Sequence, residues 1–173
     1  MNSRCEDANR AFSEMLGTEL LLNTKPTRVL FDRRDVKGAA SPMSMRQQMR
    51  FESGLLKVEA NGDFSLEEAT RAFMEMLRAV AQCQAEKVLL DGRNVKGEPR
   101  EYERFLYGEF VAQGTRELVR EYRFVPRFAY VLNEPLRDPD RYGETVAVNR
   151  GMKIKVFGTP EEALEWLGLT PAQ

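Results

Sequence analysis

Hydrophobic and polar residues follow a pattern that predicts alternating strands and helices from about residue 55 onward. Two short segments with strand patterns, 49–52 and 55–60, flank Ser53-Gly54 and predict a hairpin. Within 55–60 apolar and polar residues alternate, so one face of this strand is apolar, because successive side chains of a strand point to opposite faces. The residues at 61–63 are typical of a turn and predict that the strand ends before them.

The next segment carries the signals of a helix N-terminus. Ser65 is a good N-cap residue, and Glu68, three residues later, completes the sequence pattern of a capping box. Apolar residues then recur at helical spacing, and they predict an amphipathic helix whose apolar stripe consists of Ala69, Phe73, Met76, Leu77 and Val80.

Three further strand–helix units follow along the chain. Short apolar runs predict strands at 87–91, 127–132 and 152–157. Cap and proline signals predict helices that begin near Pro99, span 138–149, and follow Thr159-Pro160. Strands and helices that alternate in this way predict an α/β sandwich with a largely parallel sheet and right-handed crossovers.

The helix predicted after Pro99 begins with an aromatic-rich stretch of Tyr102, Phe105, Tyr107 and Phe110. One interpretation is that this helix is a lid over an apolar ligand pocket. The other is that Phe105 and Phe110 belong to the core while the tyrosines are amphipathic surface residues. We favour the second interpretation, since aromatic residues at helical spacing are more often core than ligand site.

Composition excludes several classes of function. The 173 residues include 26 Lys and Arg and 27 Asp and Glu, and a net charge of −1 provides no basic field for nucleic acid. The chain has no histidine, which excludes His-dependent triads, His-ligated zinc and His general bases. We therefore expect no nucleic-acid partner, no metal and no cofactor.

The two cysteines, Cys5 and Cys83, are too few for a disulfide scaffold, and we expect two free thiols in a cytoplasmic protein. The first residues are charged and lack the apolar region of a secretory signal. The longest apolar runs are only a few residues, whereas a membrane span needs about 20, so we expect no membrane span.

Part of the chain is repeated. Residues 8–16 match 69–77 at seven of nine positions, and 29–38 match 88–97 at seven of ten. The repeat predicts that residues 1–42 contain a partial copy of one helix–strand unit. Because its apolar stripe would be an association hazard in water, we expect this copy to dock, either on its own sheet or on a second chain in a homodimer.

Five short motifs occur in order between residues 50 and 169: 56–62, 88–97, 127–131, 149–153 and 156–167. Together they resemble the SpoIIAA-like group of the STAS and SEC14-like superfamily. The resemblance implies an α/β fold with a mixed, largely parallel sheet of four to five strands and flanking helices. It makes 43–173 the STAS domain, after the partial repeat at 1–42, and it implies no enzymatic activity.

The sequence departs from this superfamily at one important place. Anti-anti-sigma factors of the wider STAS group carry a phosphorylatable Ser or Thr just after the central strand. The corresponding loop here, 96–100, reads Lys-Gly-Glu-Pro-Arg and has no hydroxyl group. The resemblance therefore does not extend to a phosphorylation switch at that position.

Five residues are candidates for a ligand or partner site. Asp91, Arg93 and Lys96 follow the predicted central strand, at the sheet edge where open α/β sheets bind ligands. Tyr102 on the next helix and Arg150 in the 149–153 motif complete the set. The alternative, which we favour, is that Asp91 caps a loop and Arg93 is solvated or paired. No nucleophile–base pair accompanies them, so we assign no catalytic residue.

These observations predict a non-enzymatic regulatory or protein-interaction module with a protein partner. The alternative function is a carrier that binds a small apolar or anionic ligand. A closed apolar pocket would favour the carrier, whereas a filled core with an exposed apolar patch would favour the interaction module.

Overall fold

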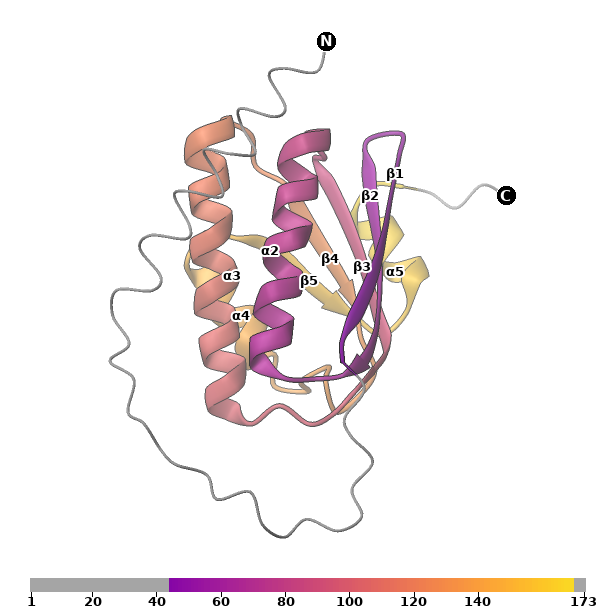
Figure 1. Ribbon diagram of the computed structural model, residues 1–173, viewed down its shortest axis with the longest axis vertical. Helices are drawn as coiled ribbons and strands as arrows, with labels where there is room; N and C mark the ends of the chain where they lie inside the picture. The colour runs from indigo at the N-terminus through magenta and orange to yellow at the C-terminus, as the bar shows by residue number, and fades with distance from the viewer. Residues whose placement is uncertain (1–43, 170–173) are drawn as a thin grey trace, which may run out of the picture. The chain divides into compact units, whose positions relative to one another are not determined.

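Five strands form one mixed sheet in the computed structural model, which describes residues 44–169 (Figure 1). The strands lie in the order β1-β2-β3-β4-β5. The first pair is antiparallel and each later pair is parallel. This sheet confirms the mixed, largely parallel arrangement that the sequence predicts. The strands are β1 Arg46–Glu52, β2 Leu55–Asp63, β3 Lys87–Lys96, β4 Arg127–Val131 and β5 Lys153–Phe157.

Helices cover both faces of the sheet. Figure 1 shows α2 and α3 in front of the strands and α5 behind them, while α4 packs against α3 and β5. The helices are α2 Leu66–Cys83, α3 Glu101–Tyr122, α4 Tyr142–Asn149 and α5 Pro160–Trp166. Within residues 44–169 no helix combines the length and the apolar character that a membrane crossing needs.

The sheet has a core on each face. On the side of α2 and α3, the Phe73 ring lies 6.2 Å from the rings of both Phe110 and Phe128. On the side of α5, Leu89 of β3 and Ala129 of β4 pack with buried residues of the last helical segment, Ala163 and Leu167. Successive residues of a strand face opposite sides of the sheet, and helices cover both sides. Strand β4 is therefore buried almost throughout, which explains its apolar sequence.

Two strand ends differ from the prediction. Residues 61–63 were expected to form a turn, but they belong to β2, and β3 continues to Lys96 rather than ending at Asp91. The reason is long-range pairing: Asn61, Gly62 and Asp63 of β2 pair with residues 94–96 of β3. One extra residue in β3 shifts the register between these stretches, as in a β-bulge. The ladder thus overrides the local turn signal.

Helix α4 begins later than the expected residue 138. The carboxylate of Asp138 accepts hydrogen bonds from the backbone N–H groups of Asp140 and Tyr142, at 3.2 and 2.9 Å. These bonds hold 138–141 as a turn, and Arg141, the N-cap, has a φ of 53°, which ordinary helix residues do not adopt. The helix therefore starts only at Tyr142.

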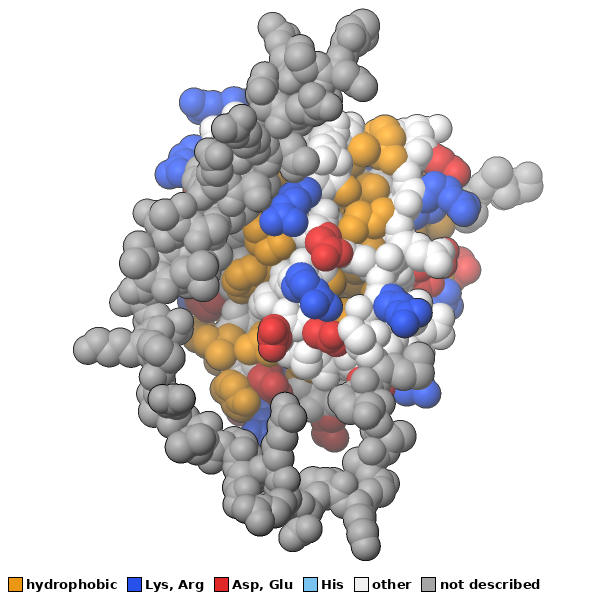
Figure 2. Space-filling view, in the orientation of Figure 1, with side chains coloured by type: hydrophobic (Ala, Val, Ile, Leu, Met, Phe, Trp, Pro, Cys, Tyr) orange, Lys and Arg blue, Asp and Glu red, His pale blue; other side chains and the backbone are white. Residues whose placement is uncertain are grey.

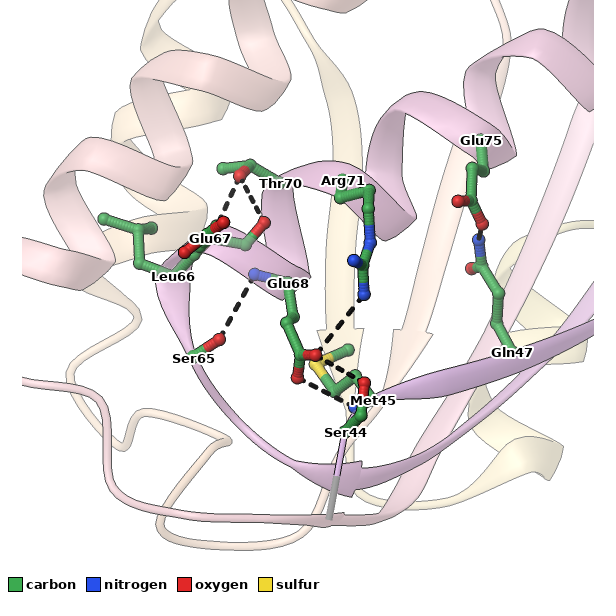
Figure 3. A network of polar contacts seen from close by, with 10 residues as sticks. All are labelled: Ser44, Met45, Gln47, Ser65, Leu66, Glu67, Glu68, Thr70, Arg71 and Glu75. Atoms are coloured by element: carbon green, nitrogen blue, oxygen red, sulfur yellow. Dashed lines mark hydrogen bonds and ion pairs between the residues drawn. The ribbon is translucent and has the colours of Figure 1, made fainter. Parts of the chain in front are cut away.

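The predicted capping box is only half formed (Figure 3). The Ser65 hydroxyl accepts from the Glu68 N–H at 3.2 Å, as expected. The Glu68 carboxylate instead accepts from the Met45 N–H at 2.8 Å and from the Ser44 hydroxyl at 2.5 Å. These bonds, the one from Met45 foremost, lower the pKa of Glu68. Glu68 thereby fastens the start of the edge strand β1 to α2, and Gln47 adds a bond to the Ala72 carbonyl.

The partial N-terminal repeat, Cys5 and the surface predicted for a homodimer lie outside the described residues, so these expectations stay predictions. Cys83 lies inside them and is a free, partly buried thiol.

Candidate functional site

Asp91 and Arg93 form an ion pair on β3. The Arg93 side chain donates from Nε to Asp91 Oδ1 at 2.9 Å and from Nη2 to Oδ2 at 2.7 Å. The Arg93 backbone N–H also donates to Oδ1, at 3.2 Å. Hydrogen bonding from Arg93 lowers the pKa of Asp91. This bidentate geometry agrees with the interpretation of Asp91 and Arg93 as a structural pair.

The five candidate residues do not form one site. Asp91 shares a strand face with Leu89, which packs toward α5. Asp91 is the main cause of the raised pKa of Arg93, and the Glu161 carboxylate of α5 adds to it. Lys96 ends β3, where its carbonyl accepts from the Phe64 N–H at 2.6 Å. Tyr102 and Arg150 belong instead to α3 and the end of α4. The structure therefore separates the Asp91–Arg93 pair from Tyr102 and Arg150.

Tyr102 belongs to an exposed apolar surface, which we call the α3–α4 patch, and Arg150 borders it. The Phe105 and Tyr142 rings lie 6.5 Å apart, and the Arg150 guanidinium lies 5.9 Å from the centre of the Phe105 ring. Arg150 is ion-paired with Glu109. Figure 2 shows hydrophobic side chains over the visible part of α3 and charged side chains over α2. The patch consists of Tyr102, Phe105, Leu106 and Tyr142, which are 54%, 36%, 46% and 39% exposed.

Our favoured interpretation of the aromatic stretch was wrong for two of its four residues. Phe105 lies on the surface rather than in the core, and Tyr107 points inward, where its ring lies 6.4 Å from that of Phe73. The buried stripe of α3 includes Val111 and Leu118, which lie four and eleven residues after Tyr107. Helical periodicity therefore places Tyr107 on the core side. Tyr102 is exposed and Phe110 contacts the core, as expected.

A cavity of about 220 Å³ lies between α3, α4, the ends of β4 and β5, and the segment 132–141. Its walls are mostly apolar and include Val111, Leu132, Ala147 and Ile154. Two tyrosines, Tyr107 and Tyr130, also line it. This arrangement gives the alternative interpretation, an apolar pocket beneath the aromatic helix, a structural basis.

The Tyr130 hydroxyl has an unusual environment. Tyr130 is only 4% exposed, and its hydroxyl finds no partner with hydrogen-bond geometry among the described residues. It interacts with the neighbouring Tyr107 hydroxyl. Burial raises the pKa of Tyr107 to about 12 and that of Tyr130 well above its usual value of 10. Both phenols are therefore neutral at physiological pH. The sequence offered one signal for this site, a tyrosine within the apolar strand 127–132.

The charged side chains at the cavity mouth hold the surrounding backbone. Arg104 donates to the carbonyls of Pro135 and Leu136 at 2.6 and 3.0 Å. Glu144 accepts from the Val156 N–H at 2.8 Å. Glu103 accepts from the N–H of Arg100, also at 2.8 Å. These bonds fix α3, α4 and the 132–141 segment around the cavity.

No cluster of three Cys, Asp or Glu side chains that could hold a metal occurs in residues 44–169. The candidate features in residues 44–169 are an exposed patch and a cavity, beside the Asp91–Arg93 ion pair.

The fold, with its hairpin, parallel strands and helices on both faces, is similar to that of an anti-sigma factor antagonist from Mycobacterium paratuberculosis. The TM-score is 0.51 and the identity 14%, over 72% of this chain and 95% of that one. This chain has a SpoIIAA-like α/β fold. An uncharacterised protein with a SpoIIAA-like fold from Shewanella loihica PV-4 aligns over 76% of this chain and 99% of its own, with 16% identity and a TM-score of 0.42.

No protein-family model matches the sequence, and no curated protein matches it significantly. The loop after the central strand β3 contains Gly97, Glu98 and Pro99 and leads directly into α3. The α3–α4 patch and the cavity therefore share the helix that follows the central strand.

Proposed function

We propose that this protein is a non-enzymatic regulatory module that binds a protein partner through the α3–α4 patch. The observation that carries the proposal is the cluster of four large, exposed apolar side chains bordered by Arg150. Exposed apolar clusters with a polar rim mark interaction sites, and Tyr and Arg are frequent among the residues that dominate binding energy. The partner surface that fits this patch is an apolar helix face or groove.

The structural neighbour supports a regulatory role. That protein's name states that it antagonises an anti-sigma factor, so it acts on another regulatory protein. We extend this to the present chain as a proposal: its partner is a regulatory protein, and the complex forms without a chemical reaction. Because the 96–100 loop has no hydroxyl group, control by phosphorylation is not part of the proposal at that position.

The test compares two charge substitutions on exposed apolar residues. Phe105→Glu places a charge in the patch, whereas Val125→Glu places one on a residue that is also exposed, at 42%, but lies between α3 and β4. A partner captured from the native source is purified, and its affinity for each variant is measured by calorimetry. We expect Phe105→Glu to weaken binding at least tenfold and Val125→Glu to leave it unchanged. Equal affinities for both variants, with circular dichroism unchanged, would contradict the proposed surface.

A second candidate function is a carrier for a small molecule, and the cavity beneath α3 is the observation that favours it. Ala147 is buried and lines the cavity, so Ala147→Leu would fill part of it. If the protein is a carrier, a small molecule should be extracted from the purified wild type and be depleted from Ala147→Leu. Extracts that do not differ would count against this function.

A further inference from the structure

The chemistry of the cavity wall limits what it can bind. Most of the wall is apolar, contributed by side chains such as Val111, Leu132, Ala147 and Ile154. The buried polar groups of the lining include the hydroxyls of Tyr107 and Tyr130. Because the two hydroxyls interact with each other, a ligand that is apolar throughout would leave one phenolic proton without an acceptor, which is costly inside a protein.

The charged groups at the mouth do not select a charged ligand. Three cationic and three anionic side chains line the cavity, so their formal charges cancel. Each one already has a partner. Arg137 pairs with Glu134 at 2.9 Å, and its buried Nε adds a donor without adding net charge. Asp138 is held by two backbone N–H groups, and Arg141 lies 3.9 Å from Glu144. A net charge brought into the apolar cavity would therefore lose its hydration without gaining a dedicated counter-charge.

We propose that the cavity binds a small, uncharged, largely apolar molecule with one hydrogen-bond acceptor, which the Tyr107 hydroxyl holds. Tyr107 lies on α3 at the cavity wall, and Tyr130 stands beside it in β4. When the Tyr130 hydroxyl points its proton at the Tyr107 oxygen, the Tyr107 proton is free to donate to an acceptor on the ligand. The inference rests on the carrier function above and adds the ligand class.

Cavity size sets the size of the ligand. Dry cavities of roughly 150 Å³ hold a benzene molecule with its six carbons, so a volume of about 220 Å³ corresponds to roughly nine non-hydrogen atoms. Ligands of this size reach dissociation constants on the order of 100 µM when they fit well.

Three molecules with the same bicyclic body form the test: indan-1-one, indane and indane-1-carboxylate. The first is neutral with an acceptor, the second is neutral without one, and the third is an anion. Each is titrated into the full chain, with calorimetry for affinity and amide NMR shifts to locate binding at the cavity. We expect indan-1-one to bind at least five times more tightly than indane and at least ten times more tightly than the carboxylate.

Variants then assign the hydrogen bond. Tyr107→Phe should reduce the affinity for indan-1-one to that for indane while leaving indane binding within about twofold. Tyr122→Phe is the matched control, since Tyr122 ends the same helix and does not line the cavity, and it should change neither affinity. Equal binding of indan-1-one and indane would overturn the role of the hydroxyl.

The outcomes separate the ligand class from the carrier function. Tightest binding by the carboxylate, with shifts at cavity residues, would overturn the uncharged class and leave the carrier function standing. If none of the three molecules shifts the amide signals of cavity residues, the inference is overturned. The extraction from wild type and Ala147→Leu then decides the carrier function independently.

Discussion

Removal of one buried oxygen should stabilise this protein. Tyr130→Phe deletes the hydroxyl that has no hydrogen-bond geometry with any described residue, while the ring keeps its place in β4 among Leu90 and Val156 of the neighbouring strands. A buried polar group without a partner costs about 1–3 kcal/mol. Because the hydroxyl interacts with Tyr107, part of that cost is already recovered. We therefore expect the free energy of unfolding to rise by about 1 kcal/mol, the low end of that range.

The measurement is urea unfolding at neutral pH, followed by circular dichroism, on the free protein. For a chain of this length, 1 kcal/mol corresponds to a rise in Tm of about 3 °C. Tyr102→Phe is the control, since Tyr102 is 54% exposed and its substitution should change stability by less than about 0.5 kcal/mol.

Alkaline pH gives a second measurement on the same variant. Burial raises the folded-state pKa of Tyr130 above 10, whereas in the unfolded chain this phenol ionises near pH 10. Ionisation of Tyr130 therefore leaves the free energy of unfolding unchanged below pH 10. Above pH 10 the phenol ionises more readily in the unfolded chain, and the free energy of unfolding falls by about 1.4 kcal/mol per pH unit up to the folded pKa. Tyr130→Phe lacks this loss, so its advantage over the wild type should grow above pH 10. A variant that is less stable than the wild type at neutral pH would refute the reasoning, because the hydroxyl would then have a good partner in solution.

Three further predictions concern stability. Asp91→Asn should lower stability above about pH 4, because hydrogen bonding from Arg93 lowers the folded-state pKa of Asp91. The difference between variant and wild type should then shrink progressively as the pH falls from about 4 through the lower folded-state pKa, and acid titrations of both proteins check this. Glu68→Gln should speed hydrogen exchange of the Met45 amide, because that N–H donates a hydrogen bond to the Glu68 carboxylate, and it should not change exchange in β4. Gly108→Ala should cost about 1 kcal/mol, since the added Cβ would lie 2.8 Å from the Gly143 carbonyl oxygen and such overpacking outweighs the helix propensity of alanine. Gly114→Ala should cost less in the same denaturation assay, because its closest contact is a leucine methyl group.

Local sequence signals predicted most elements of the fold but failed where distant segments pair. The strands predicted from 87 and from 127 and the cap at Thr159-Pro160 were confirmed, although β3 runs on to Lys96 and β4 ends at Val131, since each start depends on residues close in sequence. The turn at 61–63 was wrong because a ladder with β3 supplies more hydrogen bonds than a local turn. The sequence likewise predicted a local role for Glu68 in the capping box, but its carboxylate accepts hydrogen bonds from Ser44 and Met45 at the start of β1 instead.

The candidate site shows the same division more sharply. The sequence by itself determined the alternation of strands and helices, the absence of histidine chemistry and the fold that the motifs imply. Only the tertiary structure decided that Asp91 and Arg93 pair with each other and that Phe105 faces solvent while Tyr107 faces a cavity. Periodicity gives the angle between side chains on one helix, but the face that is buried depends on which elements pack against it. The cavity lies between α3, α4 and two strands, and its lining residues are far apart in the sequence, so no local pattern predicts it.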